Sequence, residues 1–349
     1  MQCLISVVMP VYGVEKWLEG AAHSVLDQTV RDLELILVDD GSPDQCGVLC
    51  DRLAEADARV SVLHLSENGG LSHARNAGLA QARGRYVFFM DSDDTIDPDL
   101  LERAVRAAEG AQADWVIFGA TEEHYDASGR LTLTRRIVPE ACVCRTQADK
   151  EAAVIALERQ TLLGYAWNKL YRADFLRKNA LTFPSVELIE DILFNIGCAR
   201  NARVSAVLDE CSYHYARRTS GSLTGRVLEN YFELSSRRVS ELLALYDDWN
   251  AASDDVLNAL AAIYARYIVS ALERLYDPRR SLSGRERRQR ARQMRTQPLY
   301  MRLKPHFHGA MGLIAGSPLL ALPAGWALHI MHAHLDGLFT RLRAGTNKI

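Results

Sequence analysis

The stretch Tyr86-Val87-Phe88-Phe89-Met90-Asp91-Ser92-Asp93-Asp94 decides the fold class of this chain. Its first five residues are apolar, and an apolar run of this length that stops at acidic residues is typical of a buried strand in a parallel sheet. In open α/β sheets, ligands bind just beyond the carboxyl ends of such strands. An Asp-x-Asp at that place can hold a hard divalent cation and, through the cation, a diphosphate. The alternative is an ordinary strand-to-helix turn, because Asp97-Pro98 follows and Asp is common at helix N-termini.

Composition and charge narrow the class of protein. A length of 349 residues predicts one large domain or two, and 48% hydrophobic with 24% charged residues is typical of a soluble globular protein. The net charge of −3 gives no reason to expect a nucleic-acid partner. The seven cysteines include no C-x-x-C pair, which favours reduced thiols over a zinc site. The N-terminus lacks the pattern of a signal peptide, so we expect a cytoplasmic location.

Strands and helices alternate through the first third of the chain. The predicted strands are 4–9, 33–38, 60–65, 86–90 and 115–119, and the predicted helices are 14–28, 46–56, 71–82 and 98–108. This alternation indicates βαβ units and a parallel sheet with right-handed crossovers. Because the carboxyl ends of parallel strands meet at one edge, we expect Pro10-Val11-Tyr12, Asp39-Asp40 and Asp91-Ser92-Asp93 to line one crevice.

This crevice would carry acids in place of a glycine-rich phosphate loop. The first strand is followed neither by G-x-G-x-x-G nor by a P-loop, which disfavours a dinucleotide-binding protein and a P-loop kinase. A sugar nucleotidyltransferase would show a loop rich in Gly and Lys or Arg there, and Pro10-Val11-Tyr12-Gly13 lacks one. An acidic site without a basic cradle needs a metal ion to bind a pyrophosphate, so the predicted cofactor is Mn²⁺ or Mg²⁺.

Four motifs, in this order and spacing, resemble glycosyltransferase family 2. They are Val8-Met9-Pro10-Val11-Tyr12, Leu37-Val38-Asp39-Asp40-Gly41-Ser42, Asn68-Gly69-Gly70-Leu71-Ser72-His73-Ala74-Arg75-Asn76-Ala77-Gly78 and Asp91-Ser92-Asp93-Asp94. The resemblance implies an α/β GT-A fold, with a mostly parallel sheet flanked by helices. It further implies a metal-dependent, inverting transfer of a sugar from a UDP-sugar donor to a saccharide acceptor. Bacterial members of the family suggest a role in capsular, exopolysaccharide or cell-wall synthesis.

The resemblance also assigns roles to single residues. Those expected to bind the donor are Pro10, Val11, Tyr12, Asp39, Asp40, Asn68, Arg75, Asp91 and Ser92. Among them, Asp40 would hydrogen-bond the uracil edge, and Arg75 would close the nucleotide pocket unless it is a solvated helix arginine. Asp93 would bind the metal, whereas Asp94 is expected to cap the turn.

The pattern changes after about residue 111, and residues 121–225 are expected to form the acceptor half. The segment Tyr165-Ala166-Trp167-Asn168-Lys169-Leu170-Tyr171-Arg172 is similar to a W-N-K-L-Y-R stretch of bacterial family members. Trp167 is expected to stack on the acceptor sugar, and the alternative is a core tryptophan.

The pair Glu190-Asp191 provides the candidate general base. The resemblance places the catalytic base at Asp191, and chemistry agrees, because an attacking sugar hydroxyl must lose its proton to a partly desolvated carboxylate. Glu190 would orient Asp191 or compete with it. The alternative is an acid stabilised by the dipole at a helix N-terminus.

The segment Tyr213 to Leu223 resembles the family's Y-x-Y-R…S loop, which would close over the diphosphate. Ala216 stands where an arginine is frequent, which leaves the phosphate contact open between Arg217 and Arg218. His214 would be a third metal ligand or a buried structural histidine.

The C-terminal part, 226–349, is expected to be helical and to form a region separate from a catalytic domain at 1–225, whose nucleotide-binding half is 1–120. Residues 227–276 predict two amphipathic helices, 279–304 are rich in arginine, and 305–335 contain no Lys, Arg, Asp or Glu. Three alternatives remain open for 279–335: peripheral contact with an anionic membrane, packing within the chain or in a homodimer, and a membrane span.

The sequence therefore predicts an inverting glycosyltransferase whose acceptor is a saccharide. If that saccharide is attached to a lipid carrier, the enzyme would work at the inner face of the plasma membrane. The alternative is a catalytically degenerate subunit that binds sugar nucleotides or acts as a scaffold. The intact Asp-x-Asp and Glu190-Asp191 argue against it, because a subunit freed from catalysis needs neither.

Overall fold

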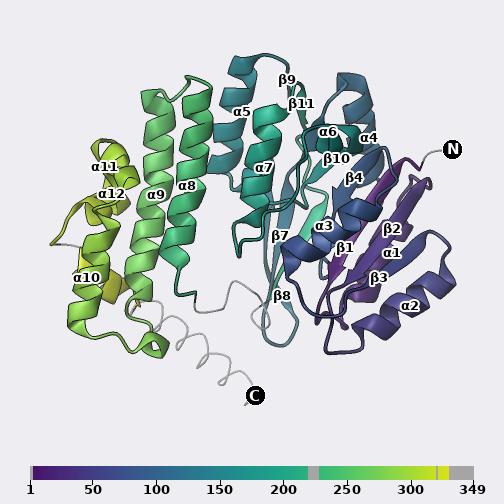
Figure 1. Ribbon diagram of the computed structural model, residues 1–349, viewed down its shortest axis with the longest axis horizontal. Helices are drawn as coiled ribbons and strands as arrows, with labels where there is room; N and C mark the ends of the chain where they lie inside the picture. The colour runs from purple at the N-terminus through teal and green to yellow at the C-terminus, as the bar shows by residue number, and fades with distance from the viewer. Residues whose placement is uncertain (1–2, 219–227, 320, 330–349) are drawn as a thin grey trace. The chain divides into compact units, whose positions relative to one another are not determined.

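The computed structural model describes residues 3–218, 228–319 and 321–329 (Figure 1). The chain forms two compact units, residues 1–226 and 227–349.

An eight-stranded sheet forms the centre of the first unit, in the order β3-β2-β1-β4-β10-β6-β11-β9. Its strands are β1 (Ile5–Val11), β2 (Leu33–Asp39), β3 (Val60–His64), β4 (Tyr86–Phe89), β6 (Trp115–Ile117), β9 (Cys142–Cys144), β10 (Lys169–Arg172) and β11 (Ser205–Val207). Strands β3, β2, β1 and β4 are mutually parallel, as are β6 and β11. Strand β10 lies antiparallel between β4 and β6, and β9 is antiparallel to β11. The prediction of a mostly parallel sheet is confirmed.

Helices cover the sheet because its strands are apolar on both faces. They are α1 (Leu18–Leu26), α2 (Cys46–Ala56), α3 (Leu71–Gln81), α4 (Leu100–Ala111), α5 (Gln147–Arg159), α6 (Ala173–Lys178) and α7 (Glu190–Asn201), with a short 3₁₀ helix at Leu162–Gly164. Alternate residues of β1, such as Val7 and Met9, share one core with the buried side chains of α1, α2 and α4. On the other face α3 lies close to the sheet at Gly78, where a Cβ would meet Val8 Cγ1 at 2.4 Å. Glycine therefore sets the close approach of α3 to the sheet.

A second, four-stranded sheet has the order β5-β12-β7-β8. Its strands are β5 (Thr95–Ile96), β7 (Ala120–Tyr125), β8 (Leu131–Ile137) and β12 (Tyr213–Arg218). The expectation of a loop from Tyr213 is wrong for residues 213–218, because pairing with β5 on one side and β7 on the other satisfies their backbone groups. The rest of the expected loop, 219–223, lies outside the described residues. Strand β12 thus runs beside β5, and β5 is the strand that follows directly after the Asp-x-Asp motif.

The second unit is helical. It contains α8 (Tyr231–Asp248), α9 (Asp254–Arg274), α10 (Gly284–Met294), α11 (Pro298–Leu303) and α12 (Gly309–Gly316), with 3₁₀ turns at Pro278–Arg280 and Lys304–His306. Helices α8 and α9 bury one apolar face each, with Leu242, Leu245 and Leu260 fully enclosed. In the described part of the chain, α9 is the one helix long and apolar enough to cross a membrane, and 61% of its apolar window is buried inside the protein. An apolar helix that is buried to this extent is typical of the core of a protein.

Candidate active site

The carboxyl ends of β1 and β2 form one wall of the site. Val11 pairs with Asp39 across the two strands, and the Asp40 N–H donates to the Val11 carbonyl at 2.9 Å. Pro10 and Val11 are buried, whereas the next residue, Tyr12, is 46% exposed. The predicted base-lining segment therefore ends in one aromatic side chain that is open to a ligand.

Asp39 and Asp40 are buried and already hold neighbouring groups of the chain. The Asp40 carboxylate accepts the N–H groups of Gly69 and Gly70, each at 2.9 Å. Asp39 accepts the Ser42 N–H at 3.0 Å and contacts His64 Nδ1 at 2.9 Å. Burial opposes ionisation of Asp39, but these donors hold its pKa below the ordinary value. Asp40 thus fastens the loop that carries the exposed Asn68 to the end of β2, while Asp39 holds the turn at Ser42 and the end of β3 at His64.

Arg75 brings two acids together that are far apart in the sequence. Its side chain is 1% exposed, so the alternative of a solvated helix arginine is wrong. Nη2 lies 2.9 Å from Asp91 Oδ1 at the end of β4, and Nη1 pairs with Asp191 Oδ1 in the first turn of α7. The guanidinium also lies over the ring of Phe183, with 5.2 Å to the centroid. Burial raises the pKa of Asp91 to about 6, against the opposing charge of Arg75.

The Asp191 carboxylate has a second donor on its other oxygen. The Ala166 N–H donates to Oδ2 at 2.9 Å, and the side chain remains 14% exposed. Asp191 is therefore oriented by Arg75 and by the loop before β10 while keeping access to solvent.

A buried polar network holds this loop, and the sequence analysis did not foresee it. Lys169 Nζ donates to the Leu162 carbonyl at 2.9 Å and to Asn168 Oδ1 at 2.6 Å. Asn195 Nδ2, on α7, donates to the carbonyls of Leu163 and Tyr165 at 2.8 and 2.9 Å. Burial lowers the pKa of Lys169 to about 7. The available signal was the pair Asn168-Lys169 between the apolar residues Trp167 and Leu170, a place where polar side chains need partners.

Glu190 has an environment unlike that of Asp191. It is 8% exposed, and its Oε2 has no hydrogen-bond partner among the described residues. Burial first, and then the charge of Asp191, raises the pKa of Glu190 to about 7. Near neutral pH this carboxyl group therefore exchanges a proton.

Asp93 points to the more open side of the site. Its side chain is 39% exposed, and Oδ2 lies 3.1 Å from Nη1 of Arg218. The Arg218 guanidinium also lies over the rings of Trp17 and Tyr125, with 4.5 and 5.7 Å to their centroids. Arg217, the neighbour on β12, is exposed, and successive side chains of a strand point to opposite faces. Between the two arginines left open by the sequence, the geometry favours Arg218.

The remaining residues of the motif are buried. Asp94 accepts the Tyr213 hydroxyl and the Ala216 N–H, both at 2.8 Å, and Ser92 is 6% exposed. Burial raises the pKa of Asp94 well above its ordinary value. Asp94 therefore ties the turn to β12, in the structural role expected for it.

The residues at this site fit a divalent cation that also binds a substrate. Asp93 offers a half-exposed carboxylate, and Mg²⁺ binds through one or two carboxylates plus phosphates and water. No group of three or more His, Cys, Asp or Glu side chains able to hold a metal occurs in the described residues. A cation here would thus take most of its ligands from the donor phosphates and water.

His214 is engaged at both ring nitrogens. Nδ1 lies 2.9 Å from Glu123 Oε1, and Nε2 lies 3.0 Å from Asp97 Oδ1. Burial opposes protonation, but the two carboxylates raise the pKa of His214. Because both ring nitrogens are already held by carboxylates, this geometry favours the structural alternative for His214.

The expected stacking of Trp167 on an acceptor sugar needs correction. The side chain is 2% exposed and stacks on Tyr213 and Tyr165, with ring centroids 4.2 and 4.5 Å apart. Its ring is closed to a sugar because the two neighbouring aromatic rings cover it. Trp167 is a core residue.

The fold and the convergent acids define the class of this protein, and comparisons with known proteins agree. The model of the family Glycosyl transferase family 2 matches residues 6–178. EpsJ of Bacillus subtilis (strain 168), named as an uncharacterized glycosyltransferase, is 36% identical over 63% of this chain and 63% of its own length. EpsH of the same organism is 33% identical over 71% of this chain and 68% of its own length.

A solved structure extends the likeness beyond the family domain. The crystal structure of residues 1–349 of TarS from S. aureus, in complex with UDP-GlcNAc, superposes with a TM-score of 0.66 at 20% identity. The superposition covers 95% of this chain and 92% of the TarS chain. The first unit therefore has the GT-A fold. The match to the family model and the identity with EpsH show that the chain belongs to glycosyltransferase family 2.

Proposed function

We propose that this chain transfers a sugar from a UDP-sugar to a saccharide hydroxyl, with inversion at the anomeric carbon, in the synthesis of a bacterial surface polysaccharide. The observation that carries the proposal is the convergence of Asp91, Asp93 and Asp191 at the end of β4, with Arg75 joining two of them. The UDP-GlcNAc bound by TarS supports a uridine nucleotide, because the two chains share their fold over most of their length.

Asp191 is the group best placed to accept the acceptor's proton. The acceptor oxygen attacks the anomeric carbon, the bond from that carbon to the diphosphate oxygen breaks, and the hydroxyl proton passes to Asp191. One lone pair on each carboxylate oxygen is occupied by Arg75 or Ala166, which leaves further lone pairs for the acceptor. The two donors fix the direction of the carboxylate, so little reorganisation precedes proton transfer.

The negative charge of the leaving diphosphate would be offset close to Asp93. A divalent cation bound there would neutralise the diphosphate as it departs. Arg218 lies within 3.1 Å of Asp93 and is 20% exposed, so its guanidinium can turn to a phosphate oxygen. Before a donor binds, the aromatic rings of Trp17 and Tyr125 hold the Arg218 guanidinium close to the site.

Calorimetric titration of UDP into the full chain, with Mn²⁺ and then with a chelator, tests the proposal. We expect metal-dependent binding that Asp93→Asn weakens by about tenfold or more, the effect of losing one charged ligand. The matched control is Asp32→Asn, which removes an exposed acid before β2.

The other outcomes separate the alternatives. If no nucleoside diphosphate binds with or without metal, the scaffold alternative replaces the enzyme. Binding of GDP or dTDP in place of UDP keeps the transferase and changes the donor.

A further inference from the structure

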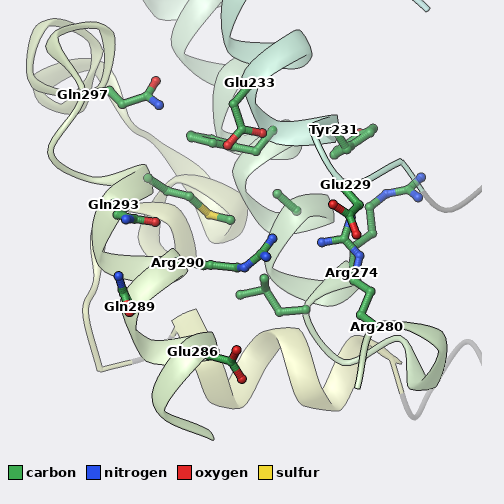
Figure 2. A pocket seen from close by; sticks show the side chains of 14 residues that line it. Glu229, Tyr231, Glu233, Arg274, Arg280, Glu286, Gln289, Arg290, Gln293 and Gln297 are labelled. Atoms are coloured by element: carbon green, nitrogen blue, oxygen red, sulfur yellow. The ribbon is translucent and has the colours of Figure 1, made fainter. Parts of the chain in front are cut away.

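The second unit contains a polar cavity of about 430 Å³ (Figure 2). Its walls are the first turn of α8, the end of α9, the 3₁₀ turn at Pro278–Arg280 and one face of α10. A volume of this size is in the range of small-molecule sites. Nothing in the proposed transfer reaction uses this cavity.

Three arginines line the cavity, each from a different element: Arg274 from α9, Arg280 from the 3₁₀ turn and Arg290 from α10. Figure 2 shows the Arg290 side chain extending from its helix towards Glu229 and the other two arginines. The Arg274 guanidinium is fixed over the ring of Tyr231, with 4.2 Å to the centroid. The three like charges are therefore gathered by the packing of the helices.

The donors of these arginines are incompletely used. The Nε atoms of Arg274 and Arg280 are buried and have no hydrogen-bond partner among the described residues. A native protein pairs nearly all its buried polar groups, so unpaired ones indicate a missing ion or ligand. Burial and then the charge of Arg290 lower the pKa of Arg280, although the carboxylates of Glu229 and Asp277 oppose this shift.

Acidic side chains at the rim offset part of this charge, since Glu229 acts on Arg280 and Arg290 acts on Glu286. Glu229, Glu233 and Glu286 also line the cavity, but all three are exposed. Glu286 is engaged by Ser283, whose N–H and hydroxyl donate to Oε2 at 2.7 and 2.6 Å. The ion pairs found in the described residues include none between these glutamates and the three arginines.

We propose that this cavity binds a phosphate group through Arg280 and Arg290, with Arg274 supplying further positive charge. Guanidinium groups match the geometry of phosphate oxygens, and their positive charge suits a dianion. The first turn of α8 adds the partial positive charge of a helix N-terminus. The same chemistry is offered by a soluble phosphate ester and by the headgroup of a phospholipid. The inference is independent of the proposed transfer reaction, whose site lies in the first unit.

Titration of inorganic phosphate into the full chain, followed by calorimetry, tests the inference. A chelator is present, because the acidic site of the first unit needs a metal ion to hold phosphate. We expect Arg290→Gln to weaken phosphate binding by about tenfold, the effect of one charge-assisted hydrogen bond. The matched control is Arg288→Gln, which removes the same charge from an exposed position on the same helix and should leave the affinity unchanged.

Vesicles distinguish the two sources of phosphate. Sedimentation is measured with phosphatidylcholine vesicles that contain phosphatidic acid, in the presence and absence of inorganic phosphate. Binding that phosphate displaces and Arg290→Gln abolishes assigns the site to a phospholipid headgroup. Phosphate binding without vesicle binding assigns it to a soluble ester. Equal phosphate affinities of Arg290→Gln and Arg288→Gln, or no binding of either probe, would overturn the inference.

Discussion

Two arginines hold carboxylates at the site of the first unit, and they differ in burial. Arg75 is 1% exposed and joins Asp91 to Asp191, whereas Arg218 is 20% exposed and contacts an Asp93 that is 39% exposed. Removing one partner of a buried pair leaves an uncompensated charge, whereas an exposed pair is screened by water. The comparison teaches that the Arg75 contact is part of the architecture, while the Arg218 contact can exchange partners when a donor binds.

The largest effect is expected for Asp191, which pairs with the buried Arg75 and is also the proposed general base. Asp191→Asn preserves the size of the side chain but removes the base, so kcat should fall about thousandfold, within the usual range for general-base catalysis. UDP affinity should change little, because the proton acceptor does not hold the nucleotide. Steady-state kinetics and calorimetry measure the two quantities. Full turnover by a natively folded Asp191→Asn would remove Asp191 from the role of base.

The second prediction compares the two arginines directly. Arg75→Met should lower the free energy of unfolding by about 3 kcal/mol, because it leaves the half-buried carboxylates of Asp91 and Asp191 without their buried cation. Arg218→Met should cost about 1 kcal/mol or less but weaken UDP binding in the presence of Mn²⁺. Urea unfolding and calorimetry provide the two measurements. Equal losses of stability in both variants would contradict the difference in role.

The last prediction concerns Glu190, which has no ion-pair partner among the described residues and changes stability only with pH. Its pKa is about 7 in the folded chain against an ordinary 4.5, because burial favours the protonated form. The stability that this carboxyl contributes is therefore fully present below pH 4.5 and is lost as the pH rises through about 7.

Glu190→Gln should remove this dependence. Between pH 5 and pH 8 the wild type should lose about 2 kcal/mol more unfolding free energy than the variant. The raised pKa of Asp91 acts in the same direction but is common to both proteins, so the difference isolates Glu190. Parallel stability curves would show that Glu190 is already ionised when folded.

The donor half was predictable because its signals are local. An apolar run that ends in acids specifies a buried strand and the place where it stops, which put Asp91 and Asp93 at the end of β4. Helix α2 was predicted with its observed bounds, Cys46–Ala56, since its apolar spacing lies within a few turns. The parallel pairing of these strands followed from the rule that βαβ crossovers build parallel sheets.

The partners of the acids were not predictable in the same way. Trp167 in the sequence fits either an acceptor platform or a core residue, and only its stacking between elements distant in the chain decided for the core. The strand at Tyr213–Arg218 likewise depends on pairing with β5 and β7. Such pairing leaves no mark on the local pattern.

By itself, the sequence determined the family, the alternation of strands and helices, and the acids that end the strands, because each of these depends on residues close together in the chain. Tertiary structure alone decided that Arg75 joins Asp91 to Asp191, and that Arg290 faces a cavity while Arg288 faces solvent. The physical reason is that packing selects the buried face of a helix: on α10 it buries Ala291 and Met294, and Arg290, one turn before Met294, lies on the same side.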